Sequence, residues 1–122
     1  MVIRTASVVL SLAGLLALIL GLLLWTGAAL NLLSMHMLVG LLAVGALCVI
    51  GIAQAFANRG SWVIAISALT VGALTLVIGM IQSTLMVGEL HWVVQVVHVV
   101  LGILTIGVGH MGVARYRKGA AS

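Results

Sequence analysis

Charged residues are scarce in this 122-residue chain. It contains five Lys or Arg residues and one acidic residue, so that 5% of its residues are charged, whereas 65% are hydrophobic. A soluble globular domain carries about 25% charged residues. Proline is absent as well, so no residue of that type interrupts the long apolar runs. The composition excludes an ordinary soluble domain and indicates an integral membrane protein.

Reactive side chains are equally scarce. Cys48 is the only cysteine and lies inside an apolar run, which excludes a disulfide within one chain and favours a packing role. The only acid, Glu89, lies between two such runs, and no serine or cysteine has a base beside it. Nothing therefore resembles a catalytic constellation, and the sequence leaves enzymatic activity uncertain.

Four apolar stretches are long enough to cross a bilayer as helices. A transmembrane helix needs about 20 predominantly apolar residues, and stretches of about that length occupy residues 6–25, 34–57, 62–83 and 90–114. Their side chains do not alternate with period two, which excludes the strands of an outer-membrane barrel. We therefore expect a single transmembrane domain over residues 1–122, an all-α four-helix bundle of up-down-up-down topology.

The positive charges lie where they can orient such a bundle. In a four-span chain the N-terminus, the second connection and the C-terminus share one side, which here holds all five basic residues: Arg4, Arg59, Arg115, Arg117 and Lys118. The positive-inside rule makes this side cytoplasmic, so both termini are expected there, in a multi-pass protein of the bacterial inner (plasma) membrane. The net charge of +4 is thus a topology signal and no evidence for nucleic-acid binding.

The last span, HWVVQVVHVVLGILTIGVGH over residues 91–110, carries three of the four histidines. Ionisable side chains within a membrane are costly and indicate a functional site by default. His91 and His98 are seven residues apart and so share a helix face, on which Gln95 and Gly102 also lie. Such a stripe on an otherwise Val/Leu/Ile helix is expected to face the interior of the bundle.

The second and fourth spans share a motif. Residues 36–45 and 98–107 both read H-x-x-[VL]-G-[IL]-L-x-[VI]-G. The spans before them match as well, since LILG ends at Gly21 and LVIG ends at Gly79, with four extra residues in the second half. Matched segments in the same order indicate an internal repeat.

The repeat predicts two helical hairpins, about 1–59 and 60–122, related by an axis along the membrane normal. His36 and His98 then lie at equivalent depth on helices that face each other diagonally across the core. Imidazole is the commonest metal ligand, and haem iron accepts two axial ligands on opposite faces. Two facing histidines therefore predict a metal-containing cofactor between them.

Each of these histidines is followed four residues later by a glycine, which leaves room for a flat macrocycle beside the helix. The arrangement resembles the four-helix core of membrane b-type cytochromes, including the cytochrome b and cytochrome b561-like groups. That resemblance implies that His36 and His98 ligate haem b, with Gly40 and Gly102 beside it. It favours an electron carrier or a redox anchor subunit over a stand-alone enzyme.

Membrane b-type cytochromes often hold a second haem, with further ligands about four turns along each helix. Here the positions about four turns after His36 are Val49 and Ile50, which cannot ligate iron. One haem b per chain is therefore expected, towards the outer side. His110 then has no histidine partner. It is expected to be an interfacial side chain, or else to ligate a second haem with a non-histidine partner or across a homodimer.

His91 and Gln95 lie outward of His98 on the same helix face. His91 is about 10 Å from His98 along the axis, where the propionates of a haem ligated by His98 would reach. We expect His91 to contact a propionate or to shuttle a proton to it, with Gln95 beside it. Two alternatives stay open, in which His91 replaces His98 as the ligand or is an unengaged interfacial residue.

Other functions also stay open at this point. In a non-haem scaffold or assembly subunit, the histidines would only hydrogen-bond across helices. In a metal or solute transporter, the triplet Met35-His36-Met37 with Met80 and Met86 offers soft ligands for Cu(I), although neighbouring residues on a helix point about 100° apart. Candidate partners are the lipid bilayer, a quinone or a redox protein, and a second copy of the chain.

Overall fold

The fold consists of four long helices joined by short connections. The computed structural model describes residues 1–58 and 62–121, which leaves Arg59 outside the described residues. Its elements are α1 Val2–Trp25, η1 Leu30–Leu32, α2 Leu33–Ala57, α3 Val63–Ile81, η2 Gln82–Thr84 and α4 His91–Ala120. The two η elements are single 3-10 turns, and the described ranges contain no strand. The predicted all-α class with four helices is confirmed.

The helices match the predicted spans within a few residues, except at the chain ends. α1 already begins at Val2, and α4 continues as far as Ala120. The extension of α4 carries Arg117 and Lys118 in its last turn, where cations interact favourably with the carbonyl ends of the helix. Charged residues thus prolong α4 beyond its apolar run, and a hydrophobicity pattern does not register such an extension.

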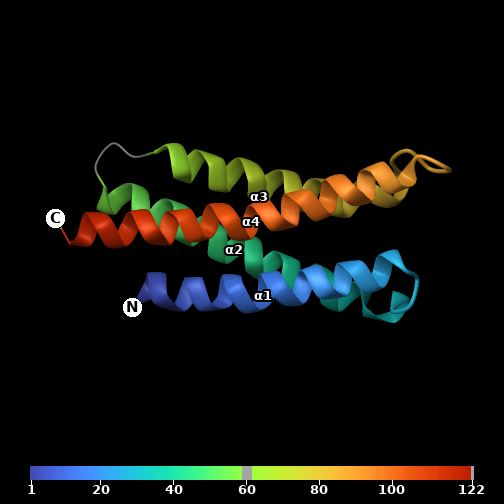
Figure 1. Ribbon diagram of the computed structural model, residues 1–122, viewed down its shortest axis with the longest axis horizontal. Helices are drawn as coiled ribbons and strands as arrows, with labels where there is room; N and C mark the ends of the chain where they lie inside the picture. The colour runs from blue at the N-terminus through green and yellow to red at the C-terminus, as the bar shows by residue number, and fades with distance from the viewer. Residues whose placement is uncertain (59–61, 122) are drawn as a thin grey trace.

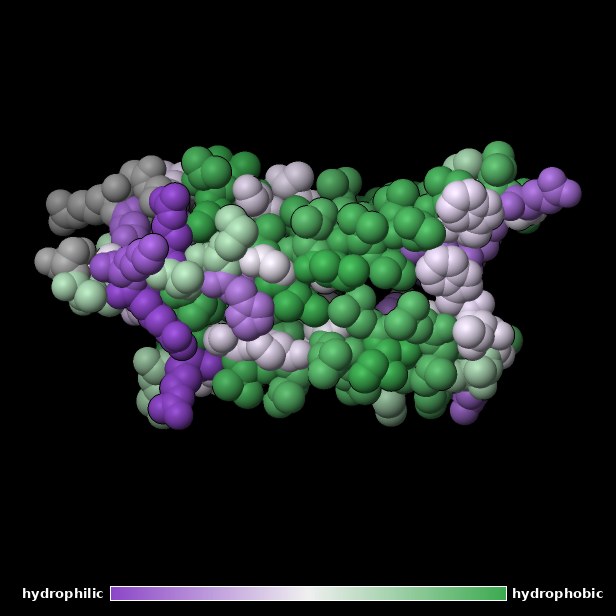
Figure 2. Space-filling view, viewed as in Figure 1, coloured by the Kyte–Doolittle hydropathy of each residue, from purple (hydrophilic) through white to green (hydrophobic). Residues whose placement is uncertain are grey.

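All four helices are long and apolar enough to cross a membrane. Large apolar side chains are exposed along them, for example Leu12 at 66%, Val63 at 75% and Ile103 at 54%. Figure 2 shows a broad apolar band across the molecule, with hydrophilic residues gathered mainly at the end that carries the chain termini. So much exposed apolar surface suits lipid and not water. The structure is compatible with an integral multi-pass membrane protein.

Figure 1 shows both termini at one end of the bundle, together with the end of α2 and the start of α3, whereas the α1–α2 and α3–α4 connections lie at the other end. We name the half near the termini the terminal half, which comprises residues 2–14, 44–57, 63–72 and 106–120. The loop half comprises residues 15–25, 33–43, 73–81 and 91–105. α2 and α4 each pack against the other three helices. They therefore form the short diagonal of the bundle.

The two halves are packed differently. Leu10, Leu47, Ile50 and Gln54, the largest fully buried side chains among the described residues, all lie in the terminal half. A Cβ built there on Gly112 would come within 2.7 Å of Ile50 Cγ2, so glycine allows the helices to approach closely. The loop half encloses a cavity instead.

Candidate functional site

The cavity in the loop half has a volume of about 350 Å³ and touches all four helices. Pockets for cofactors and other small molecules typically measure about 300–1,000 Å³. Its wall consists mainly of glycine, alanine, valine, leucine and methionine. His36 and His98 are the only ionisable residues among the described residues that line it, and Thr75, Gln82 and Thr105 add neutral polar groups. The polar chemistry of the cavity is therefore concentrated in two imidazoles.

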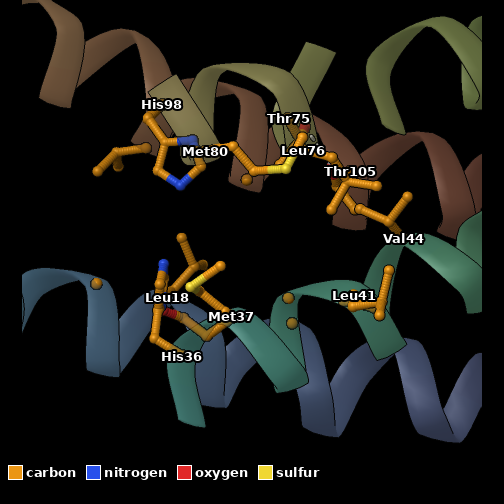
Figure 3. Close-up of a pocket in the computed structure, with 18 of the residues that line it drawn as sticks. Leu18, His36, Met37, Leu41, Val44, Thr75, Leu76, Met80, His98 and Thr105 are labelled. Carbon is orange, nitrogen blue, oxygen red and sulfur yellow. Dashed lines mark hydrogen bonds between the residues drawn. The ribbon is translucent and has the colours of Figure 1, made fainter. Parts of the chain in front are cut away.

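His36 of α2 and His98 of α4 face each other across this cavity. Their ring centres are 6.1 Å apart, and the ring planes are inclined by 71°. Figure 3 shows the two rings on opposite walls, each with a nitrogen directed toward the other ring. The structure thus brings both members of the predicted ligand pair to one place, although they are 62 residues apart in the chain.

The backbone of α1 holds His36 in a defined tautomer. Its Nδ1 lies 3.0 Å from the carbonyl oxygen of Ala17. A carbonyl oxygen only accepts hydrogen bonds, so Nδ1 carries the proton and donates it. The Nε2 of the neutral ring then keeps its lone pair for the cavity, as a metal-ligating histidine requires.

His98 is held by packing and not by a hydrogen bond. Its Nδ1 is buried, and no hydrogen-bond partner reaches it from the described part of the chain. The ring packs on α3, where a Cβ built on Gly79 would come within 2.8 Å of His98 Cε1. Gly21 of α1 has the same relation to His36, with 3.2 Å between its built Cβ and the Cε1 of that ring. Each histidine therefore lies against a glycine of the preceding helix, but only His36 is anchored.

The predicted glycines Gly40 and Gly102 also line the cavity. A Cβ built on Gly40 would meet no described atom within 4 Å, and one built on Gly102 would lie 3.3 Å from Leu18 Cδ2. Gly40 thus borders open space one turn from His36, whereas Gly102 lets α1 approach α4. With the two histidines, these glycines are the four predicted cofactor-binding residues that the structure brings together.

The other two predicted cofactor-binding residues, His91 and Gln95, are not among the residues that line the cavity. His91 Nδ1 lies 3.1 Å from the carbonyl oxygen of Leu85, so that its ring closes the α3–α4 connection. Gln95 is half-buried one turn further along α4. Gln82 is the polar side chain on the wall at this level of the bundle. A contact of His91 or Gln95 with a propionate stays a prediction.

Two threonines form a polar cluster on the cavity wall that the sequence did not predict. The Oγ1 atoms of Thr75 and Thr105 are 3.1 Å apart. Each hydroxyl also lies within hydrogen-bond distance of the carbonyl oxygen four residues earlier, at 2.7 Å for Thr75 and 2.9 Å for Thr105, so one hydroxyl can donate to its carbonyl while the other donates across the pair. Thr105 lies on the same face of α4 as His98, and this was the only sequence feature that pointed to it. Nothing in the sequence predicts its contact with Thr75 of α3.

His110 lies in the terminal half, away from the cavity. Its ring is exposed, and its Nε2 is 3.4 Å from Ser11 Oγ. It is not among the residues that line the cavity around His36 and His98. The structure therefore separates His110 from the facing pair, and its interfacial position stays a prediction.

The protein atoms alone do not complete a metal site. Within residues 1–58 and 62–121, no group of three or more His, Cys, Asp or Glu side chains could hold a metal ion. Of the methionines considered for copper, Met37 and Met80 line the cavity, whereas Met35 and Met86 do not. In this part of the chain, the potential metal ligands that line the cavity are therefore two imidazoles and two thioethers.

The chain matches no protein-family model, no curated protein and no solved structure. Its own cavity and histidine pair are therefore what indicate its function.

Proposed function

We propose that this chain is a small membrane protein similar to b-type cytochromes, which binds one haem b through His36 and His98. Its role would be to carry electrons or to anchor a larger redox partner in the membrane, with a quinone or a redox protein as the exchange partner. One observation carries this proposal: two imidazoles face each other across an apolar cavity with 6.1 Å between their ring centres.

That separation suits two ligands on one metal. Two metal–nitrogen bonds of about 2 Å each, with about 1 Å from each nitrogen to its ring centre, put the centres about 6 Å apart. The 71° between the ring planes would not prevent both imidazoles from ligating the same metal. The tautomer that Ala17 imposes on His36 leaves the correct nitrogen for ligation.

The remaining lining fits a flat, apolar group. A haem would bring the remaining ligands of its iron with it, and the open space beside Gly40 would accommodate part of the macrocycle. When bound, haem iron supplies reversible one-electron chemistry between its ferric and ferrous states. The chain contributes the two axial imidazoles, a wall that excludes water, and a fixed orientation.

The finer topology is part of the same proposal. A pair of repeated hairpins in an up-down-up-down bundle is supported by the matching relation of Gly21 to His36 and of Gly79 to His98. The two glycines also occupy matched positions in the sequence, at the ends of LILG and LVIG. The positive-inside rule supports a cytoplasmic location of both termini, in the bacterial inner membrane.

A Cu(I) site is the second candidate, because the thioethers of Met37 and Met80 line the same cavity as the histidines. Two imidazoles and two thioethers are soft enough for Cu(I). The wide cavity argues against it, since a single ion needs its ligands within bonding distance and not around 350 Å³ of space.

Hemin reconstitution of four alanine variants tests the proposal. His36→Ala and His98→Ala should lose the low-spin spectrum of bis-histidine haem, with its sharp α band after reduction. His91→Ala and His110→Ala are matched controls on the same chain and should keep that spectrum. If only His91→Ala loses it, the ligand assignment is wrong. A chain that stays colourless with hemin but binds one equivalent of Cu(I) would instead favour the copper site.

A further inference from the structure

We infer that His98 is the displaceable axial ligand, and that this cavity admits a neutral diatomic gas to the iron position on the His98 side. This inference rests on the proposed function, because it assigns unequal roles to the two ligands of the proposed haem. It follows from a difference between two rings that are otherwise placed alike.

The difference lies in the second nitrogen of each ring. A histidine that ligates through Nε2 must keep its proton on Nδ1, and metal-ligating histidines almost always donate that proton to a carbonyl, a carboxylate or water. His36 donates it to the Ala17 carbonyl oxygen at 3.0 Å. His98 has a buried Nδ1 with no partner among the described residues. The ligating tautomer of His98 therefore leaves a buried donor unsatisfied, whereas that of His36 does not.

The size of the effect can be bounded. Removing the outer hydrogen bond of a ligating residue typically weakens metal binding about 10- to 100-fold. The His98–iron bond is therefore expected to be weaker than the His36–iron bond by a factor of that order. The ring of His98 lies beside Gly79, where an added Cβ would come within 2.8 Å of its Cε1, so a side chain on α3 at this position would displace the ring.

The cavity selects the kind of ligand that can take its place. Several of the residues that line it have largely exposed side chains, among them Met37 at 54%, Leu41 at 56% and Met80 at 63%. They belong to α2 and α3, and we take the side of the cavity between these helices as its route to the hydrocarbon. An anion would have to leave water to enter, whereas a neutral diatomic gas dissolves in the hydrocarbon and passes an apolar wall.

The exchange is balanced without any further reactant. With haem held by the two imidazoles, His98 Nε2 would give up its bond to the iron and the gas would take that position. His36 would stay bound, no electron would be transferred, and the proton on His98 Nδ1 would remain in place. The freed His98 ring keeps its lone pair on Nε2.

Carbon monoxide is the test ligand, added to the dithionite-reduced, haem-loaded full-length protein. Haem binding is scored first without gas, so that failure to bind haem contradicts the proposed function itself. With gas, the Soret band should move to that of a CO complex with histidine opposite. The CO complex of His98→Ala should have the same spectrum and vibrational signature as that of the parent protein, and His36→Ala should not.

A pair of glycine variants tests the inequality independently. Gly79→Ala, which presses on His98, should raise the affinity for CO about tenfold, whereas Gly21→Ala, which presses on His36, should lower haem retention without tightening CO. The inference is overturned if a haem-loaded parent protein shows no spectral change under saturating CO. It is also overturned if the CO complex of the parent matches that of His36→Ala.

Discussion

Replacement of Gly40 by leucine should separate haem binding from folding. A Cβ built on Gly40 meets no described atom within 4 Å, and the residue lines the cavity one turn from His36. A Cβ at this position therefore displaces no neighbour, and we expect the rest of a leucine side chain to extend into the cavity. Gly45 provides the matched control, because it lies on the same helix, is exposed, and its built Cβ also meets nothing within 4 Å among the described residues.

The expected magnitude follows from the volume of the cavity. Four added carbon atoms, each needing about as much room as a water molecule (~30 Å³), occupy about a third of the 350 Å³. Haem must then share the space with this side chain, and overpacking of a filled site typically costs about 1–3 kcal/mol. At about 1.4 kcal/mol per factor of ten, the affinity for haem should fall about 5- to 140-fold. The thermal stability without haem should not decrease.

Hemin titration in detergent, followed at the Soret band, measures the affinity, and circular dichroism with temperature measures the stability. Gly40→Leu should bind haem more weakly while melting no earlier than the parent protein, and Gly45→Leu should resemble the parent in both respects. Equal haem affinity in Gly40→Leu and the parent would show that the macrocycle does not pass this glycine. Equal losses in both variants would refute the local explanation.

Two further predictions concern packing and orientation. Gly109→Ala should lower the free energy of unfolding by about 1–3 kcal/mol in a denaturant titration, because its Cβ would overlap Leu10. Gly107→Ala is the control and should not lower it, because a Cβ there meets no described atom within 4 Å. Equal losses in both variants would show that the overlap with Leu10 is not the cause. If both termini are cytoplasmic, a cysteine at Val87, which is 78% exposed, should react with a membrane-impermeant thiol reagent in intact cells once Cys48 has been replaced by serine. Labelling only after lysis would show that residue 87 faces the cytoplasm and that the termini lie outside.

Much of the fold could be predicted from the sequence, because a membrane simplifies the problem. Every backbone polar group must be satisfied inside hydrocarbon, so a long apolar run has few options besides a helix. The four helices and their approximate bounds follow from that constraint alone. The sequence also predicts that His36 and His98 face each other, because only these two histidines lie in the matched motifs at 36–45 and 98–107.

The hydrogen bonds and the position of the cavity could not be predicted from the pattern of apolar residues. The hydrogen bond from His36 to the Ala17 carbonyl depends on the rotation of α1, and backbone atoms carry no sequence signal. His91 shares a helix face with His98, but a shared face does not show at which level along α4 the neighbouring helices leave a cavity. The cavity lies at His98, whereas His91 meets the carbonyl oxygen of Leu85 in the connection.

The asymmetry between the two halves has only a partial signal in the sequence. The terminal half contains 4 leucines, 10 alanines and 8 glycines, whereas the loop half contains 15, 3 and 4, but only the contacts show which of these residues meet. Leu10 and Leu47 fill the terminal half, whereas the residues opposite His36 and His98 are glycines against which the rings lie. A bundle closed at one half and open at the other is thus a property of the assembled helices.

The most direct test of the central claim is the number and coordination of haem groups that the purified parent chain binds. Hemin should be taken up until one equivalent per chain, with the ferric protein giving a low-spin bis-imidazole electron paramagnetic resonance spectrum and the reduced protein a sharp α band. A chain that stays colourless with excess hemin, or whose bound haem is high-spin, would contradict the assignment of His36 and His98 as a ligand pair.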